Sequence, residues 1–392
     1  MTVKPKIRGF ICTTAHPEGC RKIVKEQIDY VKGAGKVNGP KKVLVIGASM
    51  GYGLASRISA AFGCGASTIG VIFDKQGSES KTASAGWYNT AAFEEFAHAD
   101  GLYAKTINGD AFSADIKNQV IDLIKKDWGK ADMVVYSLAA PRRTCADGTV
   151  YSSVLKTTGG DYTNRTIDVK NRKLSEVTIT PATEDEVTAT IKVMGGEDWK
   201  EWISAMKAAD VLEDGAVTVA YSYIGPEVTH PIYMDGSIGQ AKKHLAATAK
   251  EISAEISGVS AYVSVNKALV TQSSSAIPVV PLYISILFKV MKEMNLHEGC
   301  IEQMYRLFAE KLFGGGVKVD GEGLIRLDDL EMREDVQKNV MALWDKINEE
   351  NLGECADLDG YERDFNRLFG FDAEGVDYEA DVKTDGGIDS LK

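Results

Sequence analysis

The chain has 392 residues, of which 44% are hydrophobic, with a formal net charge of −11 and an isoelectric point near 5.1. This acidic balance argues against a nucleic-acid or membrane-surface protein, because such partners favour a basic face. The most apolar stretch, 276–288, is shorter than the roughly 20 residues that span a bilayer and contains two prolines. We therefore expect a soluble protein without a membrane span.

The amino-terminal segment lacks the apolar core of a secretory signal, so the six cysteines are expected to be thiols. This favours a cytoplasmic location, or an organelle matrix if a presequence has been removed. Cys12, His16 and Cys20 stand at equal spacing, but a proline and a glycine between them predict a loop instead of a helix that would align them. Because a tetrahedral zinc site also needs another ligand nearby, we predict no metal site.

The residues over 42–55 carry the strongest functional signal. The apolar run over 43–46 predicts a buried strand. A turn that contains Gly47, Gly51 and Gly53 follows it and opens an expected helix. Such a turn binds the pyrophosphate of a dinucleotide, because glycine permits tight turns and close backbone approach. The G-x3-G-x-G spacing favours relatives of the short-chain dehydrogenases/reductases within the Rossmann class.

A second apolar run, 68–73, ends at Asp74, about 20 residues beyond the glycine turn. An aspartate at a strand end is often only a turn residue, but folds of this class place an acidic residue there against the adenosine ribose hydroxyls. Since a carboxylate repels a 2′-phosphate, Asp74 favours NADH over NADPH, although the neighbouring Lys75 acts in the opposite direction.

The rest of the chain alternates helices and strands as a doubly wound sheet requires. The expected elements are a helix over 86–99, a strand over 102–107, a helix capped by Ser113, a strand over 133–140 and a strand over 217–222. The polar, threonine-rich stretch from 145 to 180 indicates a β-hairpin excursion, and a capping box at 183–186 begins a new helix. We predict an α/β fold with a doubly wound parallel sheet of the Rossmann type, elaborated by a β-hairpin and by helices.

No internal repeat or low-complexity linker divides the chain, so we predict a single elaborated domain over 1–392. Its dinucleotide-binding core covers about 40–145 and 215–295. The insertion over 146–214 and the C-terminal part over 296–392 are expected to contribute to the substrate site and its cover.

Tyr233 and Lys242, in a Y-x8-K arrangement, are the residues that we assign to catalysis. A phenol has a reference pKa near 10, and a close ammonium would stabilise the phenolate and lower that pKa. The lysine can also hold the cofactor ribose. A glycine and a serine between the two residues let Tyr233 stand in a loop before the helix that carries Lys242.

The same spacing recurs at Tyr283 and Lys292. These two residues are expected in one continuous helix, where 3.6 residues per turn place them on opposite faces. The chain has no Y-x3-K pair, the usual pair of short-chain alcohol dehydrogenases. We therefore assign the catalytic role to the first Y-x8-K pair and expect a different substrate entrance.

Segments across nearly the whole chain resemble the trans-2-enoyl-CoA reductases and the similar FabV-type enoyl-ACP reductases. They are HPEGC at 16–20, GASMGYGLASRI at 47–58, AGWYN at 85–89, GDAFS at 109–113, YSLAAPRR at 136–143, KVMGGEDW at 192–199, YSYIGP at 221–226, NKALVT at 266–271, HEGCIEQM at 297–304 and GVDY at 375–378. Some relatives carry Glu at position 74, which preserves the charge of Asp74.

This resemblance implies NADH-dependent reduction of the trans-2 double bond of an enoyl-CoA or an enoyl-ACP, in fatty acid synthesis or short-chain acyl-CoA reduction. It implies that Tyr233 is the proton donor, Lys242 its cofactor-binding partner and Tyr223 a substrate-contacting residue. The cofactor contacts that it implies are Gly47, Ala48, Ser49, Met50, Gly51, Tyr52, Phe73, Asp74, Asp110, Ala111, Leu138, Ala139, Lys242, Leu269, Val270 and Thr271.

Several alternatives stay open at the level of the sequence. A 3-oxoacyl or ketone reductase on the same scaffold and a non-catalytic NADH-binding regulator are the other functions, although Tyr233 and Lys242 speak against the regulator. Pro278, Pro281 and the apolar helix after them are similar to the segment that covers the nicotinamide and the acyl chain in enoyl reductases, or the helix is a core helix. The arginine pair at 142–143 either contacts carrier phosphates or lies on a solvated surface. The chain is expected to be a monomer or a homodimer.

Overall fold

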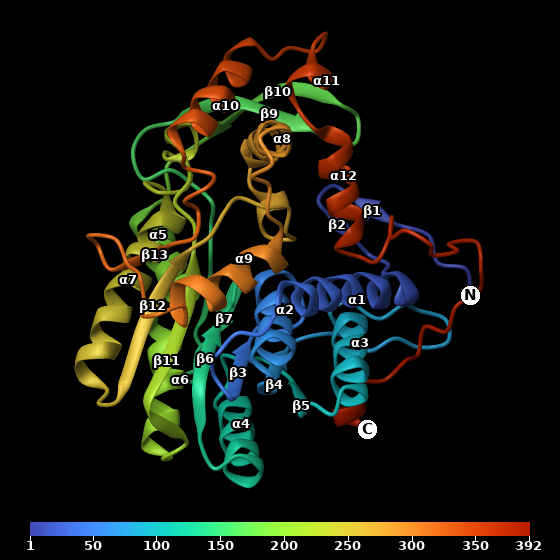
Figure 1. The fold of residues 1–392 in the computed structure, drawn as a ribbon. Helices are drawn as coiled ribbons and strands as arrows, with labels where there is room; N and C mark the ends of the chain where they lie inside the picture. Colours follow the sequence, from blue (N-terminus) through green and yellow to red (C-terminus); the bar gives the residue numbers. More distant parts are fainter.

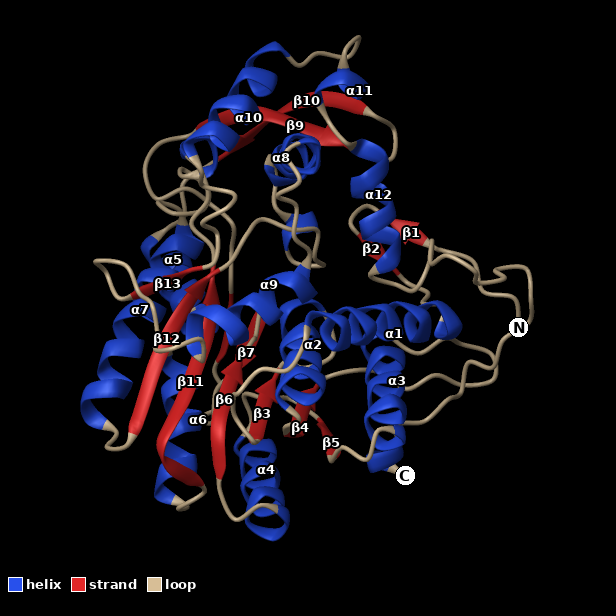
Figure 2. Ribbon diagram, in the orientation of Figure 1, coloured by secondary structure: helices blue, strands red, loops and turns tan.

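A seven-stranded sheet forms the centre of the structure, a computed structural model that describes residues 1–392 (Figures 1 and 2). Its strands are β3 (Lys42–Ile46), β4 (Ser67–Ile72), β5 (Ala104–Asn108), β6 (Ala131–Tyr136), β11 (Leu212–Ser222), β12 (Val259–Val265) and β13 (Leu324–Arg326). They are ordered β13-β12-β11-β6-β3-β4-β5, and every neighbouring pair is parallel. The strand order reverses between β3 and β6, where such folds bind their ligands. The predicted doubly wound sheet is confirmed.

Helices cover both faces of this sheet. The helices on one face include α1 (Pro17–Ala34), α2 (Gly51–Ile58), α3 (Ala85–Ala99) and α9 (Cys300–Arg306), and those on the other include α4 (Ala114–Asp127), α6 (Glu197–Ala208) and α7 (Ser237–Glu255). Successive side chains of β3 point to opposite faces, so Val43 and Val45 join the first core and Leu44 and Ile46 join the second. Both cores exclude water, which explains the uninterrupted apolar run of this strand.

The remaining elements elaborate the sheet. They are β1 (Ile7–Arg8), β2 (Ile11–Cys12), β7 (Arg142–Thr144), β8 (Val150–Ser152), β9 (Tyr162–Asp168), β10 (Lys173–Ile179), α5 (Glu184–Met194), α8 (Val280–Glu293), α10 (Glu334–Lys346), α11 (Leu352–Cys355) and α12 (Leu358–Arg367). The stretch predicted as a hairpin excursion contains two antiparallel pairs, β7–β8 and β9–β10. The capping box is confirmed, since the Thr183 hydroxyl accepts the Glu186 N–H and the Glu186 carboxylate accepts the Thr183 N–H.

Segments far apart in the sequence gather at one end of the sheet, where Figure 1 shows β9, β10, α8 and α10–α12 together. We call this group the cover. Arg165 of β9 ties its parts together, because the guanidinium donates hydrogen bonds to the carbonyl oxygens of Trp344 at 2.6 Å and Ile347 at 3.1 Å. The cover is thus built jointly by the insertion, by α8 and by the C-terminal part of the chain.

Two local features differ from the expectations. The loop expected around Cys12, His16 and Cys20 is wrong, because Pro17 begins α1 at a position where proline costs no hydrogen bond. His16 caps that helix, and its Nδ1 accepts the N–H of Gly19 at 3.1 Å. The expected strands also do not include β12 or β13, and the three residues of β13 show no strand pattern. None of the helices has the length and apolar composition needed to cross a membrane.

Candidate active site

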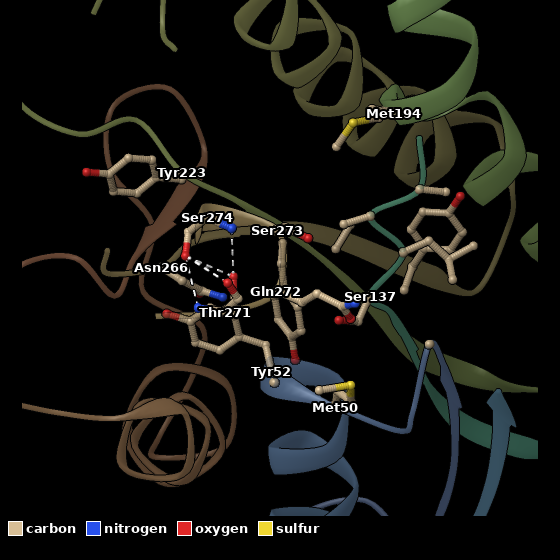
Figure 3. A pocket seen from close by; sticks show the side chains of 18 of the residues that line it. Met50, Tyr52, Ser137, Met194, Tyr223, Asn266, Thr271, Gln272, Ser273 and Ser274 are labelled. Carbon is tan, nitrogen blue, oxygen red and sulfur yellow. Dashed lines mark hydrogen bonds between the residues drawn. The ribbon is translucent and has the colours of Figure 1, made fainter. Parts of the chain in front are cut away.

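A cavity of about 520 Å³ lies at the carboxyl ends of the parallel strands (Figure 3). Residues that directly follow β3, β4, β5, β6, β11 and β12 line it, as expected for a doubly wound sheet. The sequence-predicted residues in its lining are Gly47, Ser49, Met50, Gly51, Tyr52, Phe73, Asp74, Asp110, Ala111, Leu138, Ala139, Tyr223, Tyr233, Lys242, Leu269 and Thr271. Ala48 and Val270 do not line the cavity and are buried beside it in the core.

The glycine-rich turn between β3 and α2 leaves backbone groups free to face an anion. Gly47 has a φ of +83°, and a Cβ there would collide with the Ser137 carbonyl oxygen. A Cβ on Gly53 would collide with the Gly47 carbonyl oxygen, so the turn and the helix pack backbone against backbone. No side chain caps the amino end of α2. Its unpaired N–H groups and the positive end of the helix dipole therefore suit a pyrophosphate.

Asp74 follows β4 and lies against the amino end of α3. Its carboxylate accepts a hydrogen bond from the Ser84 hydroxyl at 2.7 Å. Its backbone N–H donates to the side-chain oxygen of Asn108 at 2.9 Å, and the Asn108 amide donates back to the Asp74 carbonyl at 3.0 Å. A Cβ at Gly86 would press on the carboxylate, so the glycine makes room for it. The acidic group is thus held in place at the edge of the cavity.

Tyr233 lies in the loop between β11 and α7, as predicted. Its backbone N–H donates to the Thr229 carbonyl at 2.9 Å. Its ring packs edge to face against Tyr223, with 4.8 Å between the ring centroids and an interplanar angle of 82°. Burial alone raises the pKa of Tyr233 to about 12, with no contribution from a hydrogen bond or a neighbouring charge. The Tyr233 hydroxyl is therefore protonated at neutral pH and uncommitted within the protein.

Lys242 reaches the same cavity from the first turns of α7, which begins at Ser237. Its ammonium donates a hydrogen bond to the backbone carbonyl of Tyr221 at 3.0 Å, and burial lowers the pKa of Lys242 to about 8. The expectation that this ammonium lowers the pKa of Tyr233 is wrong. Burial raises the tyrosine pKa because it penalises the phenolate, and the ammonium is engaged by a carbonyl instead.

The second Y-x8-K pair has a different environment, as its helical spacing predicts. Tyr283 and Lys292 both lie in α8. The Tyr283 hydroxyl donates to the Glu331 carboxylate at 2.7 Å, whereas the Lys292 ammonium donates to Asp357 at 2.5 Å. This pair does not share a site, so the first pair is the one that meets in the cavity.

Sequence reasoning missed part of the lining. The missed residues include Ser137, Met194, Asn266, Lys267, Gln272, Ser273, Ser274, Ile277 and Leu368. The apolar helix expected at Pro278 and Pro281 supplies Val280 and Ile284 to the lining. Thr271 and Ser274 stabilise one of these loops, because the N–H of each residue donates to the hydroxyl of the other at 2.9 and 3.1 Å (Figure 3). The NKALVT segment next to this loop was the available signal.

The two arginines at 142–143 do not act as a pair. Arg143 is buried, and its guanidinium pairs with Glu197 at 3.3 Å and Glu201 at 2.9 Å. Arg142 is exposed. Arg143 is thus a structural residue, so neither alternative, contact with carrier phosphates or a solvated surface, holds for the two arginines together.

Strands that end around one cavity, with a half-buried lysine and a protonated tyrosine beside a glycine-rich turn, define a dinucleotide-dependent oxidoreductase. Protein-family models match most of the chain. They are the NAD(P)H binding domain of trans-2-enoyl-CoA reductase over 2–79, the trans-2-enoyl-CoA reductase catalytic region over 81–313 and the enoyl reductase FAD binding domain over 319–382. The chain belongs to the trans-2-enoyl-CoA reductase family.

Individual relatives agree with this membership. A trans-2-enoyl-CoA reductase [NADH] of Ruminiclostridium cellulolyticum is 59% identical over 394 residues, and an enoyl-[acyl-carrier-protein] reductase [NADH] of Flavobacterium johnsoniae is 57% identical over 396 residues. Both matches cover 100% of each chain. The crystal structure of Treponema denticola trans-2-enoyl-CoA reductase in complex with NAD is 53% identical and covers 98% of each chain, with a TM-score of 0.94.

The description of the third match names FAD, but the residues present do not fit a flavin dinucleotide. The segment 319–382 supplies one residue, Leu368, to the cavity. None of its glycines lines the cavity, so it supplies no glycine turn there that would hold a second pyrophosphate. We assign no step of the reaction to FAD.

Proposed function

We propose that this chain reduces the trans-2 double bond of an enoyl thioester at the expense of NADH, with Tyr233 and Lys242 as its catalytic residues. The single observation that carries this proposal is that Tyr233, whose hydroxyl forms no hydrogen bond within the protein, lines the same cavity as Lys242 and the glycine-rich turn. NADH supplies a hydride to the β-carbon of the thioester.

The cofactor contacts that we propose come from the ends of the parallel strands. They are Gly47, Ala48, Ser49, Met50, Gly51, Tyr52, Phe73, Asp74, Asp110, Ala111, Leu138, Ala139, Lys242, Leu269, Val270 and Thr271. The amino end of α2 holds the pyrophosphate, and Asp74 accepts hydrogen bonds from the adenosine ribose. Ala48 and Val270, which lie behind the lining, contribute through their backbone and by packing.

Tyr233 acts on the negative charge that develops on the thioester oxygen during conjugate reduction. Its hydroxyl donates a hydrogen bond to that oxygen or supplies the proton. A high pKa keeps the hydroxyl protonated before the charge develops. Lys242, held by the Tyr221 carbonyl, binds the cofactor ribose beside it. Tyr223 contacts the substrate, and Ile277, Val280 and Ile284 near and within α8 provide apolar surface for the acyl chain.

The reaction is tested by following NADH oxidation with crotonyl-CoA, with longer enoyl thioesters on CoA or on acyl-carrier protein, and with acetoacetyl-CoA. We expect the enoyl thioesters to be reduced and acetoacetyl-CoA to be poor. Faster reduction of acetoacetyl-CoA would favour a 3-oxoacyl reductase. Tight NADH binding without turnover of any substrate would favour the non-catalytic regulator.

We also propose one elaborated domain over 1–392, in which the regions near 40–145 and 215–295 bind NADH and the regions 146–214 and 296–392 form the substrate site and its cover. The contacts of Arg165 with Trp344 and Ile347 support this division, because they join the two latter regions. We propose a cytoplasmic location, which the six free thiols support, and action as a monomer or homodimer. Fractionation and sedimentation equilibrium measure these two properties.

Replacing Asp74 with Ser is expected to raise the efficiency with NADPH relative to NADH. Removal of the carboxylate abolishes its repulsion of a 2′-phosphate, a partly screened contact worth about 1–3 kcal/mol, or roughly 5- to 150-fold. Steady-state kinetics of both cofactors measure the ratio, with Asp115→Ser, an exposed residue outside the cavity, as the control. An unchanged ratio would mean that Asp74 is only a turn residue.

A further inference from the structure

Glu331 is a fully buried carboxylate behind the wall of the cavity, in the segment between β13 and α10. It is absent from every motif that identifies the cofactor site. Its Oε1 accepts hydrogen bonds from the hydroxyl of Tyr283 at 2.7 Å and from the hydroxyl of Tyr223 at 3.1 Å. Its Oε2 accepts the backbone N–H of Ala268 at 2.7 Å. One side chain thus receives three donors.

These three donors come from three different structural elements around the cavity. Tyr223 follows β11, Ala268 lies in the loop after β12, and Tyr283 belongs to α8 of the cover. Tyr223 and Ala268 themselves line the cavity. In Figure 3 the Tyr223 hydroxyl points away from the other labelled side chains of the pocket. Glu331 therefore binds the Tyr223 hydroxyl on the side away from the cavity. The aromatic ring of Tyr223 is the part that faces the cavity.

The Glu331 side chain accepts a hydrogen bond from each of these three donors. Burial raises the pKa of Glu331 above its ordinary value, and the nearby Lys267 ammonium and the hydrogen bonds from Ala268 and Tyr283 offset only part of this rise. Burial and the Glu331 charge raise the pKa of Tyr223 and of Tyr283 well above the ordinary value. Both phenols remain protonated, so each has one hydroxyl proton and donates it to the carboxylate.

Tyr223 and Tyr233 consequently differ in whether their hydroxyl proton is available to a ligand. The single hydroxyl proton of Tyr223 is committed to Glu331, whereas the Tyr233 hydroxyl is uncommitted. The Tyr223 ring packs edge to face against Tyr233 at 4.8 Å, so the orientation of one ring restricts the other. A carboxylate that fixes Tyr223 also restricts where the Tyr233 hydroxyl points.

We propose that Glu331 is a positioning residue for the reduction, which anchors the Tyr223 hydroxyl so that the Tyr223 ring holds Tyr233 in its reactive orientation. This inference rests on the proposed function of Tyr233. Glu331 contacts neither substrate nor cofactor, and it acts through Tyr223. Misplacement of a reacting group by about 1 Å can lower a rate by roughly a hundredfold, so loss of the anchor is expected to appear in kcat.

The test is a double-mutant cycle of Glu331→Gln and Tyr223→Phe. The amide keeps the volume of the carboxylate but replaces one acceptor oxygen by a donor, and Phe removes only the anchored hydroxyl. We expect each single variant to lower kcat for crotonyl-CoA by about tenfold or more, with little change in the Kd for NADH. Because both changes break the same link, the double variant is expected to match the more impaired single variant.

Asp328→Asn is the matched control, because Asp328 is a buried carboxylate of the same segment that pairs with Arg326 and contacts no cavity tyrosine. We expect it to lower the Tm without lowering kcat. Wild-type kcat in Glu331→Gln, or losses that multiply in the double variant, would overturn the proposal. If Glu331→Gln does not fold, Tyr223→Phe decides alone, since wild-type kcat in that variant would also overturn it. Tyr233→Phe, measured in parallel, shows whether the proposed function itself has failed.

Discussion

Tyr233→Phe is expected to lower kcat for an enoyl thioester by roughly a hundredfold or more while the Kd for NADH stays unchanged. The substitution keeps the ring that packs against Tyr223 and removes only the hydroxyl. That hydroxyl is the donor for the developing negative charge, and it makes no contact within the protein that folding would lose. Steady-state kinetics with crotonyl-CoA and fluorescence titration with NADH measure the two quantities separately.

Tyr30→Phe serves as the control, because Tyr30 lies on α1 outside the cavity. Turnover of Tyr233→Phe close to that of this control would contradict the assignment of the proton donor. A loss of NADH binding in Tyr233→Phe would instead indicate that the hydroxyl belongs to the cofactor site.

Lys242→Ala is expected to weaken NADH binding and to lower kcat together, because one ammonium serves both tasks. A hydrogen bond to a charged group contributes about 1.5–3 kcal/mol, which corresponds to roughly 10- to 150-fold in Kd. Isothermal titration with NADH and steady-state kinetics measure the two effects. Lys250→Ala, at an exposed position of the same helix, is the control. A change in thermal stability alone would make Lys242 a structural residue.

The pH dependence of the wild-type protein tests the same ammonium independently. Burial lowers the pKa of Lys242 to about 8, so the charge is present below that pH and is lost as the pH rises toward the ordinary lysine value near 10.4. The NADH affinity is therefore expected to fall above pH 8 in the wild type. In Lys242→Ala the weaker affinity is expected to stay flat over the same range.

Local sequence patterns predict the sheet and half of the site well. The apolar run before Gly47 predicts a strand that is buried on both faces, and the glycine spacing predicts the turn that follows it. Tyr233 and Lys242 are only nine positions apart, and Gly236 and Ser237 between them indicate that one lies in a loop and the other on a helix. These features depend on neighbouring residues, which a single sequence displays.

The parts that the sequence does not predict depend on distant contacts. Glu331 meets Tyr223 across 108 positions of the chain, and nothing in its own segment distinguishes it from an ordinary surface glutamate. The burial of Tyr233 likewise depends on residues distant in the sequence. The predicted lowering of its pKa by the nearby lysine is therefore wrong, because burial raises that pKa. The loop predicted around His16 is wrong because a proline that ends one helix can equally begin another, and Pro17 begins α1.

The contacts of Arg165 with Trp344 and Ile347 determine when the cover can form during synthesis of the chain. On the ribosome, the β9–β10 hairpin emerges long before Trp344 and Ile347, its partners near the end of α10. A nascent chain that has already formed β3 and its glycine turn therefore carries an Arg165 guanidinium that still lacks the Trp344 and Ile347 carbonyl oxygens. Contacts between such distant segments form late and slowly. We therefore expect the cover to close only after α10 has been synthesised.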